Sequence, residues 1–483
     1  MGAALILWCG DMLGRRRSIM LGATVMIIGV IIQVTAFPGS GPLAQFIVGR
    51  VVTGIGNGIN TSTIPTYQAE CSPTANRGLL ICIEGAMIAF GTLIAYWIDY
   101  GASYGPDDLT WRFPIAFQIL FGLIIIVGMY VLPDSPRWLF VREHYEQGEK
   151  VVAALFGKEI QHHDVQMQKT VILDSIRAYV TKTHAKIKIT IADDDTSSGQ
   201  SGSSKTPISA VFTGGKTQHL RRMLLGASSQ FMQQVGGCNA VIYYFPILFE
   251  HSIKETHNMS MLLGGVNMIV YSIFATLSWF LVERVGRRKL FLYGTVGQCL
   301  SMVLTFACLI PGTRNTAKGA AVGLFTYIAS FGATWLPLPW LYPAEINPLR
   351  TRARANAIST CSNWLFNFVI VMITPVMIDN IGWGTYLFFA VVNACFLPII
   401  YFFYPETAGR SLEEIDIIFA KGYTENINYV TAAKQLPKLS DEEVEQAAIQ
   451  YGFAGPDAAE KQASSSASAS DAEEAVGAVS KHE

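Results

Sequence analysis

The chain has 483 residues, of which 51% are hydrophobic and 15% are charged, whereas about 25% of residues are charged in an average soluble protein. A net charge of -1 gives no basis for binding nucleic acid. The eight cysteines have no paired spacing, so we expect no disulfide framework, zinc site or bound cofactor. So much apolar sequence does not fit into one soluble core, and the composition predicts a multi-pass protein of the lipid bilayer.

Windows of about twenty mostly apolar residues are long enough to cross the bilayer as helices, which pair every backbone group internally. Ten such windows occur, at residues 18–37, 43–66, 79–99, 114–132, 222–249, 261–282, 290–310, 318–342, 354–378 and 384–404. We therefore expect an all-α integral membrane protein.

Two polar stretches divide the chain. Residues 136–221 predict a cytoplasmic linker with amphipathic helices and a disordered segment, and residues 405–483 a cytoplasmic tail that is mostly disordered. Transmembrane lobes then occupy residues 1–135 and 222–404. Lys and Arg gather in alternate connections, which places those connections and the C-terminus in the cytoplasm and favours the plasma membrane. These basic positions are residues 15–17, 77, 137, 221–222, 284–289 and 350–354.

Three landmarks occur twice in the same order. The second copies lie 272, 275 and 272 residues after the first, which predicts two pseudo-symmetric lobes of about six helices. The pairs are Gly14-Arg15-Arg16 and Gly286-Arg287-Arg288, Glu70 with Arg77 and Glu345 with Arg352, and Pro133-Asp134 and Pro405-Glu406.

The same offset, applied to the fifth and sixth windows, places the first helix before Met1 and leaves residues 1–10 of the second. Ten residues rise about 15 Å, half of the hydrocarbon thickness. We expect the first helix and most of the second to be missing, either through a late start in the gene model or because the product is truncated.

Several motifs resemble those of the sugar porter family of the major facilitator superfamily. They are GDMLGRRR, GRVVTGIGNG, PTYQAECSPTANRG, PDSPRWL, QQVGGCN, VERVGRR, PLPWLYPAEINPLRTRAR, NWLFNF and PETAGRSLEEID. Three strings are most similar to the fungal branch that includes glycerol/proton symporters: NTSTIPTYQAECS, IEGAMIAFGTLIAYWIDYG and WRFPIAFQI. The resemblance implies a monomer with the major facilitator fold. It also implies alternating-access transport of glycerol, a hexitol or a hexose, coupled to a proton in the full-length form.

A polyol needs amides for its hydroxyls, which both donate and accept. Gln233, Gln234 and Asn239 lie at one helix end beside two glycines. Spacing alone allows two interpretations, substrate contact or helix–helix amide bonds, and the resemblance favours substrate contact. It adds Asn267, Trp340, Asn363, Trp364 and Asn367 as positions that line the substrate cavity. Trp340 follows Leu336-Pro337-Leu338-Pro339, where missing amide donors break a helix.

Glu84 departs from the family pattern, because the usual substrate-binding Gln of this helix aligns with Gly85. It lies seven residues after Arg77, about 10 Å into the helix, where an ionised carboxylate costs about 3 kcal/mol. Three roles stay open: Glu84 binds substrate hydroxyls, relays a proton or forms a structural pair. The proton acid of the family belongs to the first helix.

Charged residues at helix ends form a separate set, which either forms interlobe ion pairs that gate transport or anchors the chain in the cytoplasm. The set consists of Asp11, Arg15, Arg16, Glu70, Arg77, Glu283, Arg287, Arg288, Glu345 and Arg352.

Three rival interpretations remain. A sugar sensor that does not transport resembles a transporter but has a long signalling tail, unlike the short tail here. A second rival is that the chain is truncated and is an inactive transporter. We expect no enzyme, because no nucleophile–base or metal constellation occurs.

Overall fold

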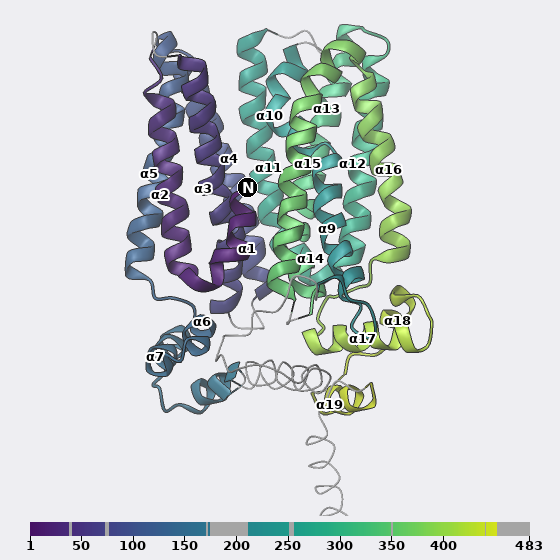
Figure 1. Ribbon diagram of the computed structural model, residues 1–483. Helices are drawn as coiled ribbons and strands as arrows, with labels where there is room; N and C mark the ends of the chain where they lie inside the picture. The colour runs from purple at the N-terminus through teal and green to yellow at the C-terminus, as the bar shows by residue number, and fades with distance from the viewer. Residues whose placement is uncertain are drawn as a thin grey trace, which may run out of the picture.

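The computed structural model describes residues 1–37, 41–72, 77–170, 172–173, 211–250, 256–348, 351–439 and 441–451. Within these ranges the regular elements are helices, in two bundles that stand side by side (Figure 1). The first bundle, purple to blue, contains α1 (Gly2–Leu13), α2 (Arg15–Val34), α3 (Pro42–Cys71), α4 (Arg77–Ala102) and α5 (Asp107–Val131).

The second bundle, teal to green, contains broken as well as continuous helices. Its elements are α9 (His219–Val235), α10 (Cys238–Leu248), α11 (His257–Val285), α12 (Arg287–Leu309), α13 (Arg314–Ser330), the π-helix η4 (Phe331–Trp335), α14 (Leu338–Ile346), α15 (Arg352–Ile381) and α16 (Gly384–Phe403). Shorter helices lie together at one end: α6 (Pro136–Val141), α7 (Tyr145–Phe156), α17 (Leu412–Thr424), α18 (Tyr429–Gln435) and α19 (Asp441–Gln450).

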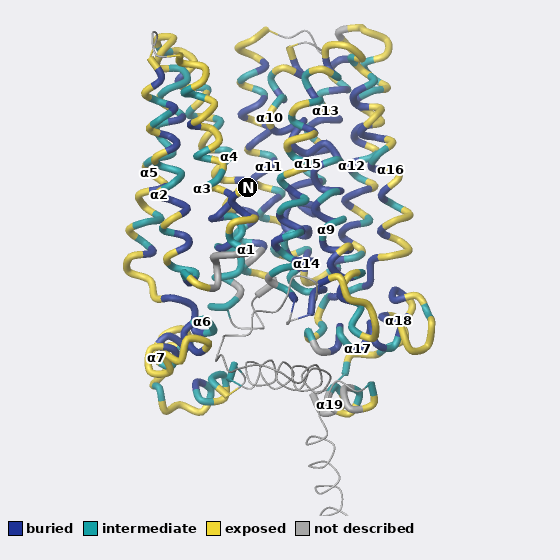
Figure 2. The backbone as a smooth tube through the Cα atoms, in the orientation of Figure 1, coloured by how far each residue is buried: buried dark blue, intermediate teal, exposed yellow. Residues whose placement is uncertain are grey.

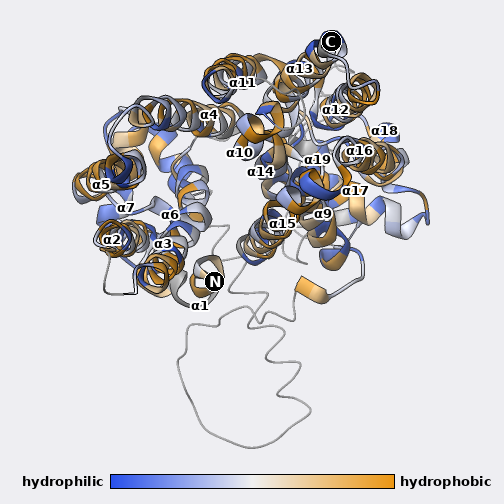
Figure 3. Ribbon diagram, turned by 90° about the horizontal axis from the view of Figure 1, so that it is seen from above, coloured by the Kyte–Doolittle hydropathy of each residue, from blue (hydrophilic) through white to orange (hydrophobic). Residues whose placement is uncertain are grey.

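The bundles have apolar outer surfaces, as a membrane protein requires. Large side chains such as Ile124, Val127 and Met372 are exposed, and Figure 2 shows exposed segments along the outer helices of both bundles. Seen from above, hydrophobic residues cover the helices of each bundle (Figure 3). Among the described residues, eight helices are long and apolar enough to cross a membrane. The chain is therefore a multi-pass membrane protein.

Each predicted window coincides with observed helices, with ends that differ by a few residues, and α1 precedes the first window. Two windows are interrupted. The window at 222–249 divides into α9 and α10 at Gly236 and Gly237, where Gly237 has a φ of 98° that L side chains rarely adopt. The window at 318–342 divides into α13, η4 and α14, as its prolines predict.

An aromatic group holds the second break in place. The ring of Phe291 on α12 lies 4.8 Å from that of Trp335 and 5.6 Å from that of Tyr342. Tyr342 in turn stacks on Tyr404, at 5.1 Å between ring centroids. These rings are almost fully buried, so the interrupted segment is fixed by packing rather than by continuous helix hydrogen bonds.

The tail expected to be mostly disordered contains the helices α17, α18 and α19 in the part that the structure describes. The side chain of Arg222, 1% exposed, forms an ion pair of 2.5 Å with Asp416 on α17, and its guanidinium lies over the ring of Phe419. Ser411 and Glu414 form a capping box at the start of α17. The expectation is therefore wrong for residues 405–439 and 441–451, while the rest of the tail and the predicted disordered linker segment lie outside the described residues.

The bundles meet along α4 and α11. Trp279 Nε1 donates to the carbonyl of Cys82 at 3.1 Å, and Ser272 Oγ donates to the carbonyl of Ala89 at 3.2 Å. Both donors belong to α11 and both acceptors to α4, so polar bonds as well as packing join the two bundles.

Candidate substrate site

Buried amide side chains gather between the two helix breaks. We call them the amide cluster: Gln230, Gln233, Gln234, Asn239, Asn363 and Asn367. Asn363 Nδ2 on α15 donates to Gln230 Oε1 at 2.5 Å and to Gln233 Oε1 at 2.9 Å, both on α9. Asn239 Nδ2 on α10 donates to Gln234 at 2.5 Å and to Asn367 at 2.8 Å. The cluster therefore contains five of the eight amides and indoles predicted to line the substrate cavity.

Prolines explain why the glutamines point at η4 and α14. In an α-helix the carbonyl of residue i accepts from the N–H of residue i+4, but Pro339 and Pro343 have no N–H. The carbonyls of Trp335 and Pro339 are thus left without their regular donors. Gln233 Nε2 donates to the carbonyl of Trp335 at 2.8 Å, and Gln230 Nε2 donates to the carbonyl of Pro339 at 2.7 Å. The interruption and the amide cluster therefore depend on each other.

The break between α9 and α10 is held in a similar way. Tyr327 Oη donates to the carbonyl of Gly236 at 2.8 Å, and Asn393 Nδ2 donates to the same carbonyl at 3.0 Å. Two buried side chains thus replace the helix bonds that the break removes.

Two further side chains have unused hydrogen-bonding atoms. Asn267 on α11 is completely buried, and neither its Oδ1 nor its Nδ2 has a partner among the described residues. Trp364 Nε1 on α15 is also buried without a partner there. Because an unpaired buried polar group is costly, such atoms are expected to meet a ligand or water. Trp340, on α14, is partly buried.

Glu84 lies half-buried on α4, in the other bundle. Among the described residues it makes neither a hydrogen bond nor an ion pair, and the side chain of Arg77 lies outside the description. A Cβ added to the next residue, Gly85, would lie 3.6 Å from Pro337 Cβ and 3.7 Å from Leu336 Cγ, so this part of α4 faces the second break. Glu84 is thus placed near the level of the amide cluster, across the contact between the bundles.

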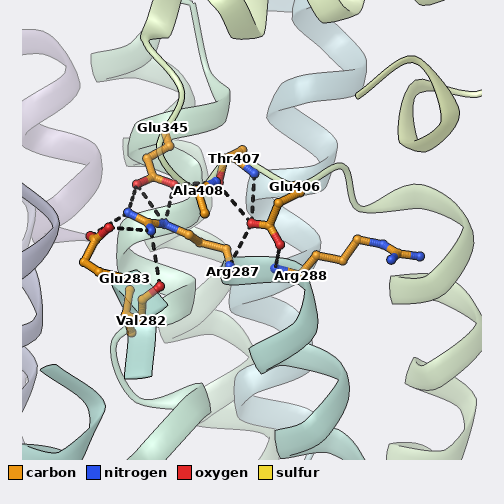
Figure 4. Close-up of polar contacts among 8 residues, drawn as sticks. All are labelled: Val282, Glu283, Arg287, Arg288, Glu345, Glu406, Thr407 and Ala408. Atoms are coloured by element: carbon orange, nitrogen blue, oxygen red, sulfur yellow. Dashed lines mark hydrogen bonds and ion pairs between the residues drawn. The ribbon is translucent and has the colours of Figure 1, made fainter. Parts of the chain in front are cut away.

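The charged helix ends form two matching clusters. In the second bundle (Figure 4), Arg287 Nη2 lies 2.8 Å from Glu345 and 2.9 Å from Glu283, and Thr407 Oγ1 donates to Glu345 at 2.6 Å. The backbone N–H groups of Arg287 and Arg288 donate to Glu406 at 2.8 and 3.1 Å. A carboxylate therefore caps the start of α12.

The first bundle repeats this arrangement with other residues. Arg15 Nη2 lies 3.0 Å from Glu70, and Ser135 Oγ donates to Glu70 at 2.5 Å. The backbone N–H groups of Arg15 and Arg16 donate to Asp134 at 3.0 and 3.3 Å. Arg15, Glu70, Asp134 and Ser135 correspond in sequence to Arg287, Glu345, Glu406 and Thr407.

In this structure the ion pairs of Arg15 and Arg287 lie within a bundle, and pairing between the lobes stays a prediction. The observed pairs lie within a bundle because each arginine begins a helix beside carboxylates of its own bundle. Arg352 Nε donates to the carbonyl of Asn347 at 3.2 Å, and the side chains of Asp11 and Arg77 lie outside the description.

Sequence reasoning missed five members of these sites, namely Gln230, Asp134, Ser135, Glu406 and Thr407. Gln230 precedes Gln233 by three residues and so shares its helix face, a signal that was available. Asp134 and Glu406 were recognised only as landmarks of the repeat, although their recurrence in both halves pointed to a shared structural role.

Comparison with known proteins identifies the family. The family model described as "Sugar (and other) transporter" matches residues 1–419. The chain is 46% identical to the sugar transporter STL1 of Saccharomyces cerevisiae, over 93% of this chain and 75% of that protein. It is 45% identical to the major facilitator superfamily transporter mfsA of Aspergillus fumigatus, over 94% and 79%.

The fold is similar to that of the proton:xylose symporter XylE bound to 6-bromo-6-deoxy-D-glucose, with a TM-score of 0.70, 22% identity and 86% of each chain covered. The helical bundles therefore have the major facilitator fold. Because the family consists of transporters, the prediction that the chain is not an enzyme is confirmed. The chain belongs to the sugar porter family of the major facilitator superfamily.

Proposed function

We propose that this chain carries a small polyhydroxylated solute across the plasma membrane by alternating access, coupled to a proton. Glycerol or a hexitol is the first candidate and a hexose the second. The lobes at residues 1–135 and 222–404 rock about the site, and the C-terminal tail faces the cytoplasm. The proposed substrate residues are Gln233, Gln234, Asn239, Asn267, Trp340, Asn363, Asn367 and Glu84.

The amide cluster is the observation that carries this proposal. It lies where two membrane helices are broken, which is the usual position of a substrate site in transporters of this architecture. Each amide offers both a donor and an acceptor, as a hydroxyl requires. Asn267 and Trp364 add buried atoms that have no partner among the described residues. A neutral polyol needs such groups and no counter-ion.

The charge clusters support the alternating-access part of the proposal. Each cluster ties the start of one helix to the ends of at least two others within one bundle. Such ties make each lobe a rigid body, which is what rocking between two states requires. In this proposal the clusters gate transport indirectly, by keeping the lobes intact.

Uptake of radiolabelled glycerol, a hexitol and glucose, in a host without its own polyol uptake and at two external pH values, tests the proposal. We expect saturable uptake that is faster at the lower pH and is abolished by a protonophore. Asn363→Ala should remove it, whereas Asn380→Ala should not, since Asn380 lies on the exposed end of the same helix and its side chain donates to the carbonyl of Val376, one turn earlier. Uptake equal to that of empty cells, with the chain present at the surface, would reject the proposed function.

A further inference from the structure

Arg221 and Arg222 lie next to each other in the first turn of α9, but only one of them has a counter-ion. Arg222 is buried and forms an ion pair of 2.5 Å with Asp416 on α17. Arg221 is only partly buried and forms no ion pair among the described residues. The positive charge of Arg221 is therefore available to an anion from outside the chain.

Two stacked rings fix the position of Arg221. Its guanidinium lies over the ring of Tyr429, 4.3 Å from the centroid, and that ring stacks on Phe419 at 4.9 Å between centroids. The guanidinium of Arg222 lies over Phe419 at 4.7 Å. A Cβ added to Gly422 would lie 2.6 Å from Tyr429 Cδ1, so the ring needs a glycine at this point of α17. The cation–π contact holds Arg221 in place, which lowers the entropy cost of binding a ligand.

A hollow of about 320 Å³ opens beside the stacked rings. Arg221, Asn426 and Asn428 are among the residues that line it. The side chain of Asn426 is exposed and bonds to no described residue. The carboxylate of Glu425, the residue before it, is paired with Lys421 at 4.0 Å. A guanidinium without a counter-ion, beside an amide that can donate, is suited to a phosphate group.

The hollow lies at the end of a membrane helix. Asn428 Nδ2 donates to the carbonyl of Phe402 at 3.0 Å, one residue before α16 ends. α16 is long and apolar enough to cross a membrane, and α18 lies beside its end in both views (Figures 1 and 3). Tyr401, Phe402 and Tyr423 are exposed here, as is typical of aromatic side chains at the level of the lipid headgroups.

We propose that Arg221 and Asn426 bind the phosphate of an anionic phospholipid in this hollow. The inference goes beyond the proposed function and takes from it only that the tail faces the cytoplasm, where the membrane surface is negative. An anionic headgroup supplies the counter-ion that Arg221 lacks, whereas a zwitterionic headgroup carries its own cation. The bound lipid joins α9 to the segment of α17 and α18 at the membrane surface.

Calorimetric titration of the purified full chain in detergent micelles tests the site. The titrants are a short-chain phosphatidylserine, a phosphatidylcholine of the same chain length, and inorganic phosphate. Arg221→Gln removes the guanidinium. Lys434→Gln is the matched control, because Lys434 is exposed on α18 and does not line the hollow. Asn426→Gly removes the amide and suits the backbone, since the φ of Asn426 is 52°.

We expect phosphatidylserine to bind about fivefold more tightly than phosphatidylcholine, and more tightly than inorganic phosphate. Arg221→Gln should weaken phosphatidylserine binding by about fivefold, the contribution of one basic side chain at an anionic surface, and Lys434→Gln should leave it unchanged. Asn426→Gly should weaken it by about threefold, through the loss of one hydrogen bond. Because Asn426→Gly leaves the stacked rings intact, it decides the test if Arg221→Gln fails to fold.

Three results would overturn the inference. Phosphatidylcholine that binds as tightly as phosphatidylserine would show that the hollow does not select negative charge. Equal weakening by Arg221→Gln and Lys434→Gln would show that the lipid is attracted by the basic surface as a whole. Inorganic phosphate that binds as tightly as phosphatidylserine would make this a site for a soluble anion. The titrations do not measure uptake, so each of these results leaves the proposed transport standing.

Discussion

Asn267 and Asn363 are both buried amides, but they use their hydrogen-bonding atoms differently. Asn363 Nδ2 bridges two glutamines of α9, whereas Asn267 has no partner among the described residues. Asn363 stabilises the fold, whereas Asn267 has hydrogen-bonding atoms available for a ligand. The two residues should therefore respond differently to the same substitution, although their burial is almost equal.

Leucine is close to asparagine in shape, so Asn363→Leu and Asn267→Leu form a matched pair. Asn363→Leu leaves the amide oxygens of Gln230 and Gln233 without this donor, which should cost about 1–3 kcal/mol of stability. Asn267→Leu removes no internal bond, so the unfolding temperature should stay the same or rise while polyol affinity falls. Thermal unfolding and binding of the purified proteins measure both effects. Equal destabilisation by the two changes would mean that Asn267 is a structural amide.

At the scale of the helices, the sequence predicted where the chain crosses the membrane but not all of the breaks. The prolines of residues 337 and 339 signal a break because their effect on a helix is local. The break at Gly236 and Gly237 was not predicted, since glycines are also common in continuous membrane helices. It depends on Tyr327 and Asn393, which lie far away in the sequence.

In the candidate site, too, some features could be predicted from the sequence and others could not. Glutamines and asparagines could be recognised as candidates, because few polar side chains occur in these windows. Their partners could not, since the donors and acceptors are backbone carbonyls of another helix. Sequence spacing alone left helix–helix bonds and substrate contact equally open, and the observed bonds are of the first kind. Binding of substrate would exchange some of them for bonds to hydroxyls.

Two carboxylates that share Arg287 test the role of the second charge cluster. The side chain of Glu345 is 15% exposed and joins α14 to α12, whereas that of Glu283 is 48% exposed and lies four residues before Arg287 on the chain. Glu345→Gln should cost about 3 kcal/mol, because it removes one partner of a buried pair. Glu283→Gln should cost about 0.5 kcal/mol or less.

Thermal unfolding separates the two variants, and uptake shows what the cluster does. We expect Glu345→Gln to change the transport rate while the order of preferred substrates stays the same, since the cluster lies at the helix ends and not among the amides. A changed order of substrates would contradict this role.

At the scale of the whole molecule, the internal repeat predicted two equivalent clusters but not all of the pairs within them. Several arginines lie near several carboxylates in the sequence, so spacing along the chain does not decide which of them pair. The structure pairs Glu70 with Arg15 and Glu345 with Arg287. The backbone bends at the glycines before the arginines, with φ of 84° at Gly14 and 92° at Gly286, and so turns each arginine toward its own bundle.

The ends of α4 and α11 opposite the charge clusters meet through glycines. A Cβ on Gly264 would overlap the Tyr96 hydroxyl, and a Cβ on Gly265 would lie 2.9 Å from Trp97. Alternating access requires these ends to close when the other ends open.

We therefore expect Gly264→Val to disfavour the closed arrangement of these helix ends, so that kcat for uptake falls by about tenfold while substrate affinity changes little. Gly101→Val is the control, because a Cβ on Gly101, at the same end of α4, has nothing within 4 Å. Binding and uptake, measured on the same preparations, distinguish a change in kcat from a change in substrate affinity. A Gly264→Val variant that loses affinity but keeps its kcat would show that the glycines shape the site and do not control the movement of the lobes.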